Sequence, residues 1–363
     1  MDRFRTVLHR FRTVSHRFRA VLRRFGPFRI VFGPFRAPNV AKSLRKLAKT
    51  SRKFRENSRV ACLIYLERIS SQCSVADYVV NSDILRLLTS LWNLETHNQT
   101  IRLRLVCLIG QLFRHATFVE SRHIDDPLFE ILLDGIGDLS EDPTEEIKLN
   151  VRRRSVAACG ELIFYLATQQ EREKHDPSRE WEVPSQVLDV MASVVPASDE
   201  IICHYGIKTI ENIGSSSTET LAKWFPAHGR GFNLAKTITR ACLEALRRPG
   251  GECFALTCYG ALQQLVRQKN VDQRLSHVDK VLQLNHKDQI SLIRVAMHEL
   301  PKALPAAFAL LGVLLLKETE RDADSGLQSL IDESLVRQLV VILSQAVTHP
   351  VVRGKAFLVL CLL

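Results

Sequence analysis

Apolar residues recur along this chain in a twelve-residue pattern that appears seven times. The clearest copy runs from Ile101 to Leu112 and reads IRLRLVCLIGQL. The other copies begin at Ser58 (the least regular), Val151, Ile202, Phe254, Ala303 and Val352, and successive starts lie 43 to 52 residues apart. Spacings of this order are typical of repeat proteins, in which each unit packs on its neighbours in the sequence.

Within each copy, apolar or small residues stand at offsets 0, 4, 8 and 11 from the start. These offsets fall on one face of an α-helix, so each copy predicts a helix with one buried face. The residue at offset 4 is small in all copies but the one with Leu105: Cys62, Ser155, Gly206, Cys258, Ala307 and Ala356. We expect the small residue to let a neighbouring helix approach closely.

Another apolar stretch precedes most copies, as a helix–turn–helix unit requires. These stretches cover residues 84–94, 128–139, 187–195, 234–246 and 330–347. Turn-forming residues such as Asp142-Pro143 and His349-Pro350 separate the two helices of a unit. Two segments depart from the scheme: Gln169 to Pro184 is predicted as a charged loop, and Leu275 to Leu300 as an extra helix pair without the pattern.

Arginine and glycine also recur at fixed places in the pattern. Arginine follows the first residue in four copies, as Arg59, Arg102, Arg152 and Arg353. Glycine stands at offset 9 in three copies, as Gly110, Gly160 and Gly312. The pattern resembles the second helix of a HEAT repeat, in which the arginine lies near the turn between helices and contacts the same or the next repeat. The resemblance implies an all-α fold over residues 39–363, a HEAT/armadillo-type α-solenoid of about six to seven helix pairs in which these residues are structural.

A different repeat, with a period of seven, occupies the start of the chain. Phenylalanine recurs at positions 4, 11, 18 and 25, and valine follows three residues later in the first three copies. On a helix these residues form one apolar stripe surrounded by arginines, which Gly26-Pro27 would end. We therefore separate a basic segment, residues 1–38, which is either disordered or a lone amphipathic helix. It could be a membrane-surface helix, a transit peptide, a basic arm for an acidic polymer, or a recent duplication or wrongly assigned gene start without function.

The basic residues are concentrated at the N-terminus, and the rest of the chain is not basic. The formal net charge is +11, but residues 1–60 hold 18 Lys/Arg and 2 Asp/Glu, which leaves the rest mildly acidic. The nine cysteines are scattered without a CxxC pair, which favours a reducing, cytoplasmic compartment and buried thiols. The longest apolar run, Ala303 to Leu316, is too short to span a bilayer and predicts a buried helix.

Motifs for chemistry are lacking. The sequence contains no phosphate-binding loop, protein-kinase signature, zincin motif or nucleophile elbow, and its histidines and cysteines lack metal-ligand spacing. The run Gly214 to Thr218 is expected to end one helix and cap the next. We therefore expect no enzyme activity, cofactor, metal site or small-molecule substrate. The densest basic cluster of the body, Arg152-Arg153-Arg154, is expected to be a solvated helix face, and alternatively a site for an acidic partner peptide.

Three runs carry a closer resemblance: VRRRSVAACGELIFYLATQ at 151–169, KTIENI at 208–213 and VRGKAF at 352–357. They are similar to the C-terminal HEAT-repeat region of the Unc-51-like kinase four/RUNKEL family, over about residues 40–363. The resemblance implies links to a kinase or pseudokinase domain and to microtubules, and in animals to cilia. This chain contains no kinase domain, so kinase activity does not carry over.

The sequence therefore predicts a non-catalytic protein-interaction scaffold that is cytoplasmic or cytoskeleton-associated. A protein partner would bind the solenoid surface, with tubulin or microtubules as candidates. Two alternatives stay open: a microtubule- or nucleic-acid-associated protein acting through its basic N-terminus, and a part of a serine/threonine kinase whose catalytic domain is missing here. Because the repeat pattern stops inside its last helix at Leu363, we also expect a piece of a longer protein, or a core completed by a partner.

Overall fold

The computed structural model describes most of the chain after residue 51. The described residues are 52–120, 123–124, 126–140, 143–172, 183–225, 251–267, 302–319, 333–345 and 347–363, with scattered positions between 234 and 244. The predictions for residues 1–38 and 275–300, and most of that for 234–246, lie outside these residues. The chain divides into two compact units between Tyr65 and Leu66, and the packing described below is that within the second unit.

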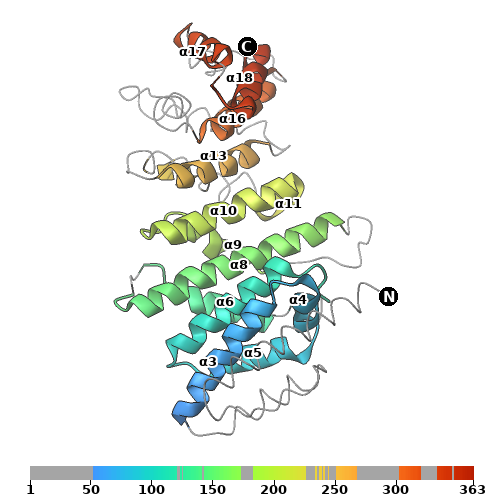
Figure 1. Ribbon diagram of the computed structural model, residues 1–363, viewed down its shortest axis with the longest axis vertical. Helices are drawn as coiled ribbons and strands as arrows, with labels where there is room; N and C mark the ends of the chain where they lie inside the picture. Colours follow the sequence, from blue (N-terminus) through green and yellow to red (C-terminus); the bar gives the residue numbers. More distant parts are fainter. Residues whose placement is uncertain are drawn as a thin grey trace. The chain divides into compact units, whose positions relative to one another are not determined.

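The described residues form thirteen helices and no strand, which confirms the all-α fold (Figure 1). The helices of the N-terminal half are α3 (Arg52–Ile69), α4 (Cys73–Val80), α5 (Asp83–Leu94), α6 (Gln99–His115), α7 (Asp126–Ile136) and α8 (Glu146–Arg172). Those that follow are α9 (Ser185–Val194), α10 (Glu200–Ser216), α11 (Thr218–Trp224), α13 (Glu252–Val266), α16 (Leu304–Thr319), α17 (Glu333–Ser344) and α18 (Pro350–Leu362).

Each copy of the twelve-residue pattern lies in or at the start of its own helix. These pattern helices are α3, α6, α8, α10, α13, α16 and α18. In α6 the residues at offsets 0, 4, 8 and 11, which are Ile101, Leu105, Ile109 and Leu112, are all buried. The same offsets are buried in α8, α10 and α13. Burial of this one apolar stripe stabilises each helix against its neighbours.

The helices of the second unit pack largely in chain order. Among the pattern helices, α6 packs on α8, α8 on α10, α10 on α13, α13 on α16 and α16 on α18. The preceding helices α5, α7, α9 and α17 each pack on the pattern helix that follows them, and α7 also contacts both α5 and α9. The two sets form neighbouring layers, so residues at one offset of the pattern come to lie on adjacent helices.

Polar side chains cap several of the helices. Ser82, Asn98 and Asp199 accept hydrogen bonds from backbone amides in the first turns of α5, α6 and α10. Ser217 does the same for α11, because its hydroxyl accepts from the Thr220 amide at 3.1 Å. The run Gly214 to Thr218 thus ends α10 and caps α11, as its composition predicts.

Several boundaries differ from the sequence predictions. Residues 169–172 were expected to be loop but continue α8, because its buried face extends through Tyr165 and Leu166 to Gln169. The short helix α4 was not anticipated, since eight residues show little periodicity. The predicted buried helix at 303–316 corresponds to α16, and no described helix is both long and apolar enough to cross a bilayer.

The prediction of buried thiols holds for part of the cysteines. Cys159, Cys203 and Cys258 are buried, and no disulfide joins the described cysteines. Cys73, Cys253 and Cys361 are exposed, contrary to that prediction. These three stand at the ends of helices, where apolar neighbours in the sequence do not guarantee burial.

Candidate protein-binding groove

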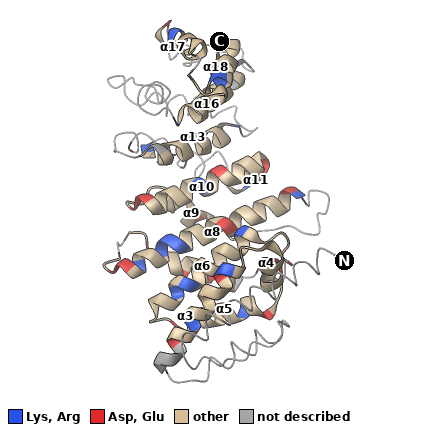
Figure 2. Ribbon diagram, in the orientation of Figure 1, with Lys and Arg blue, Asp and Glu red and all other residues tan. Residues whose placement is uncertain are grey.

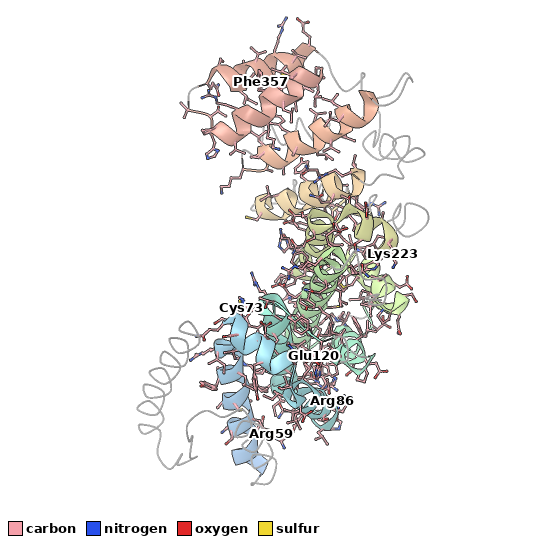
Figure 3. All side chains as sticks on the ribbon, turned by 90° about the vertical axis from the view of Figure 1, so that its right-hand side faces the viewer. Arg59, Cys73, Arg86, Glu120, Lys223 and Phe357 are labelled. Carbon is pink, nitrogen blue, oxygen red and sulfur yellow. The ribbon has the colours of Figure 1, made fainter. Side chains whose placement is uncertain are left out.

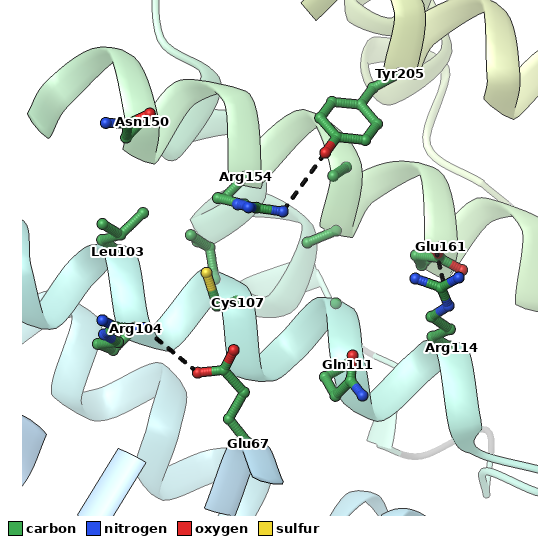
Figure 4. Close-up of a pocket in the computed structure, with 14 residues that line it drawn as sticks. Glu67, Leu103, Arg104, Cys107, Gln111, Arg114, Asn150, Arg154, Glu161 and Tyr205 are labelled. Atoms are coloured by element: carbon green, nitrogen blue, oxygen red, sulfur yellow. Dashed lines mark hydrogen bonds and ion pairs between the residues drawn. The ribbon is translucent and has the colours of Figure 1, made fainter. Parts of the chain in front are cut away.

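A groove of about 350 Å³ lies along the exposed side of α6 and α8. Its sides carry the charged residues Glu67, Arg104, Arg114, Arg154 and Glu161, and its remaining lining comprises Leu103, Val106, Cys107, Gly110, Gln111, Asn150, Ala157, Ala158 and Tyr205 (Figure 4). All fourteen lining residues belong to the second compact unit.

The repeat pattern itself produces this groove. Residues at offsets 3, 6, 10 and 13 lie opposite the buried stripe and spaced three or four apart, so they share one helix face. In α6 they are Arg104, Cys107, Gln111 and Arg114, and in α8 the corresponding lining residues are Arg154, Ala157 and Glu161. The pattern helices α6 and α8 lie side by side (Figure 2), so their exposed faces adjoin.

Small residues form the bottom of the groove, where α6 and α8 lie closest. A Cβ atom added at Gly110 would come within 3.2 Å of the Cα of Ala158. This distance is shorter than ordinary van der Waals contact, so a side chain at this position would have to push the two helices apart by a few tenths of an ångström. Gly110, Ala157 and Ala158 have small or no side chains, and the space that they leave free is the groove.

The arginines of the groove make only long contacts within the chain. Arg104 lies 3.8 Å from Glu67, Arg114 lies 4.0 Å from Glu161, and Arg154 donates to the Tyr205 hydroxyl at 3.5 Å (Figure 4). Guanidinium–carboxylate hydrogen bonds of full strength are about 2.7–2.9 Å long. Most of the donor capacity of these three side chains is therefore available to a ligand.

The titratable groups of the groove are poorly suited to catalysis. Burial raises the pKa of the Cys107 thiol, the nearby Glu67 raises it further, and Arg154 and Arg104 oppose that rise. The thiol is therefore protonated at neutral pH and is a weak nucleophile. Burial also raises the pKa of Glu161, partly offset by Arg114, but no histidine lines the groove as a second acid or base. No cluster of three or more His, Cys, Asp or Glu side chains suited to a metal ion occurs among the described residues.

The three consecutive arginines of α8 have different surroundings. Arg152 is 8% exposed and donates to the carbonyl of Asp138 at 2.6 Å. Arg153 binds both carboxylate oxygens of Asp199, the N-cap residue of α10, at 2.6 to 3.3 Å. Arg154 is exposed in the groove. The expectation of one solvated face therefore fits Arg154 alone, because successive residues of a helix point about 100° apart.

The arginines that follow the first pattern residue also differ among copies. Arg102 is 14% exposed, its guanidinium lies 4.3 Å from the ring centre of Trp92 in α5, and it forms an ion pair of 3.2 Å with Asp134 in α7. Trp92 donates to the same carboxylate at 2.8 Å, which joins three helices in one network. Arg353 in α18 is exposed, whereas Arg59 in α3 is half-buried.

The recurring glycines at offset 9 are likewise unequal. A Cβ atom at Gly160 would lie 2.2 Å from the Thr209 hydroxyl of α10, so either the hydroxyl or the helices would have to shift. At Gly312 the nearest side-chain atom, in Leu362 of α18, would be 3.9 Å away, which is ordinary contact. A methyl group would thus crowd the neighbouring helix at Gly110 and Gly160 but not at Gly312.

Comparisons with known proteins agree with a kinase-related origin. The chain is 29% identical over 209 residues to the serine/threonine-protein kinase RUNKEL of Arabidopsis thaliana. The aligned region covers 52% of this chain but 14% of RUNKEL, so the chain spans a small part of that relative. No family model matches the chain, and no solved structure matches it.

Proposed function

We propose that this chain is a non-catalytic protein-interaction scaffold, built as a HEAT/armadillo-type solenoid. The observation that carries the proposal is the groove of α6 and α8, whose arginines retain unused hydrogen-bond donors. The serial packing of the pattern helices supports the solenoid, since each helix contacts the next pattern helix in the chain. In such an array the exposed faces form an extended surface for a protein partner.

The structural roles of the pattern residues belong to the same proposal. Arg102 reaches both the preceding helix α5 and the following helix α7, which is the kind of contact the HEAT resemblance implies. Gly110 and Gly160 allow α6, α8 and α10 to pack closely. Arg102 and Gly160 fix the geometry of the groove from outside its lining, whereas Gly110 also forms part of the groove surface.

Site-specific cross-linking tests the scaffold. A photoreactive benzoylphenylalanine in place of Gln111 in the groove should capture a defined protein from cells, whereas the same group in place of the exposed Ser90 of α5 should not. Adding Ala157→Trp, which fills the groove, should abolish capture while the helical circular dichroism spectrum is retained. Equal capture from both positions, or capture that survives Ala157→Trp, would count against the groove as the binding surface.

The similarity to RUNKEL favours a second candidate function, in which the scaffold serves a serine/threonine kinase as another part of the same protein or as its partner. The purified chain should then bind no ATP and transfer no phosphate by itself, but should co-purify with kinase activity from cells. Phosphate transfer by the recombinant chain alone would overturn the non-catalytic proposal.

A further inference from the structure

The charged side chains of the groove indicate which charge and spacing a bound peptide should have. We infer that the groove binds an extended acidic peptide whose carboxylates stand three residues apart, one on Arg104 and one on Arg154. This inference rests on the proposed scaffold function and adds the charge and spacing of the bound segment. Figure 4 shows the two arginines on the neighbouring helices α6 and α8.

The charge balance of the groove favours a moderately acidic ligand. Three arginines face two glutamates, and none of the three is held in a short ion pair. Arg114 is 65% exposed, so it can turn toward a ligand at little cost. A carboxylate placed on such an arginine gains two parallel hydrogen bonds.

The same balance disfavours a nucleic acid. A phosphate backbone carries closely spaced negative charges, and Glu67 and Glu161 would lie beside it. Residues 61–363 are also mildly acidic overall, because the basic excess lies in residues 1–60. A peptide can instead place neutral residues opposite the two glutamates.

The spacing of the carboxylates follows from the repeat. Arg104 and Arg154 both stand at offset 3, on pattern helices that pack against each other. Packed helices lie about 8–10 Å apart, and a polyproline II segment advances about 9 Å in three residues and returns to the same face. Residues i and i+3 of such a peptide therefore meet equivalent positions on α6 and α8. The next offset-3 residue is Tyr205 of α10, whose hydroxyl would face residue i+6.

The test measures fluorescence anisotropy of labelled peptides with the full chain at low salt. The probe is Gly-Pro-Glu-Pro-Pro-Glu-Pro-Pro-Gly, compared with a glutamine version and with a version that carries its two glutamates side by side. We expect the i, i+3 peptide to bind about tenfold more tightly than either comparison peptide, because only it offers a carboxylate to each arginine. Binding of the two glutamate peptides to the basic N-terminus contributes a background that does not depend on spacing, and the version with adjacent glutamates measures it.

Variants assign the binding to the groove. Arg104→Gln and Arg154→Gln should each weaken binding of the i, i+3 peptide about three- to tenfold. Arg86→Gln, which removes an exposed arginine from α5 (Figure 3), should change it less than about twofold. Circular dichroism confirms that each variant is folded.

Three outcomes would overturn the inference: no preference for the i, i+3 spacing, no effect of either groove variant, or tighter binding of a dT12 oligonucleotide that both variants abolish. A partner cross-linked from Gln111 in the absence of acidic-peptide binding would refute the acidic peptide but leave the scaffold intact. Absence of both signals would refute the two together.

Discussion

At the scale of single residues, neighbouring arginines of one type do different work because a helix turns about 100° per residue. Arg152 and Arg153 lie against other parts of the fold, whereas Arg154 faces the groove. The sequence shows the cluster RRR but not which member is exposed, since exposure depends on where α7 and α10 pack. Residue identity alone therefore could not select Arg154 as the one that lines the groove.

The network around Arg102 leads to a first prediction. Arg102→Ala should lower the free energy of unfolding by about 2 kcal/mol, because it removes a cation–π contact and an ion pair whose arginine is largely buried. Arg102→Lys should cost about 1 kcal/mol, since lysine keeps the charge but lacks the planar group. Arg353→Ala, at the same place in the pattern but exposed, is the matched control and should cost less than about 0.5 kcal/mol. Equal costs in urea unfolding for Arg102→Ala and Arg353→Ala would contradict this assignment.

The pair Arg153–Asp199 gives a pH-dependent prediction. Burial raises the pKa of Asp199, but hydrogen bonds from Arg153 and the Ile202 amide outweigh it, and the pKa is lowered overall. A carboxylate with a lowered folded-state pKa stabilises the fold above its unfolded pKa of about 4, and this stabilisation is lost as pH falls through the folded-state value. Asp199→Asn keeps the N-cap and should cost about 2 kcal/mol at pH 7.

Urea unfolding of wild type and Asp199→Asn across pH 3–7 measures the effect. The difference between the two proteins should shrink below about pH 4, where the carboxylate of the unfolded wild-type chain begins to take up a proton while that of the folded protein is still ionised. A difference that stays constant with pH would mean that the ion pair contributes nothing.

At the scale of elements, the twelve-residue pattern was sufficient to locate all seven pattern helices, because a stripe at offsets 0, 4, 8 and 11 can be buried only on a helix. The groove was harder to predict. Its residues at offsets 3, 6, 10 and 13 are as varied as any exposed face, and only helix packing brings Arg104, Arg154 and Tyr205 together. The glycines mark where two helices approach, yet the sequence does not show which of them lack space for a methyl group.

Substituting alanine for two of the glycines at offset 9 should therefore change the free energy of unfolding in opposite directions. Gly160→Ala should destabilise the fold by about 1–3 kcal/mol, because its methyl group would overlap the Thr209 hydroxyl. Gly312→Ala should be neutral or stabilise by up to about 1 kcal/mol, since alanine favours the helix and the space is open. Thermal and urea unfolding of both variants checks the difference.

A double-mutant cycle separates overlap from helix propensity. Thr209→Ala removes the hydroxyl that the new methyl group would meet, so Gly160→Ala should cost less in a Thr209→Ala background than in the wild type. If the two substitutions were simply additive, the close contact between α8 and α10 would not be the cause of the destabilisation.

At the scale of the whole molecule, the two regions that are candidates for binding a partner differ in charge. The groove belongs to the mildly acidic body, whereas residues 1–38 hold ten arginines and one aspartate. The groove suits one defined peptide, and its arginines number three. An arm of many arginines instead suits a surface with many negative charges, for which electrostatic binding is strong and weakly specific. The two regions can therefore be tested independently.

Microtubules are the acidic surface that the kinase-family resemblance suggests, since tubulin carries acidic tails. If the basic segment, residues 1–38, binds microtubules, its deletion should weaken co-sedimentation with them about tenfold or more. Binding of the wild type should also fall steeply between about 50 and 200 mM salt, because several counterions are released on binding. Changing the ten arginines of residues 1–38 to glutamine should weaken binding as much as the deletion does. A second variant replaces the four phenylalanines of the apolar stripe by serine, at Phe4, Phe11, Phe18 and Phe25. It should bind as well as the wild type, because the apolar stripe would matter only for a membrane or a helical partner. Arg104→Gln should leave sedimentation unchanged, which distinguishes the arm from the groove. Sedimentation that persists after deletion of residues 1–38 would exclude the arm and move any microtubule contact to the helical body.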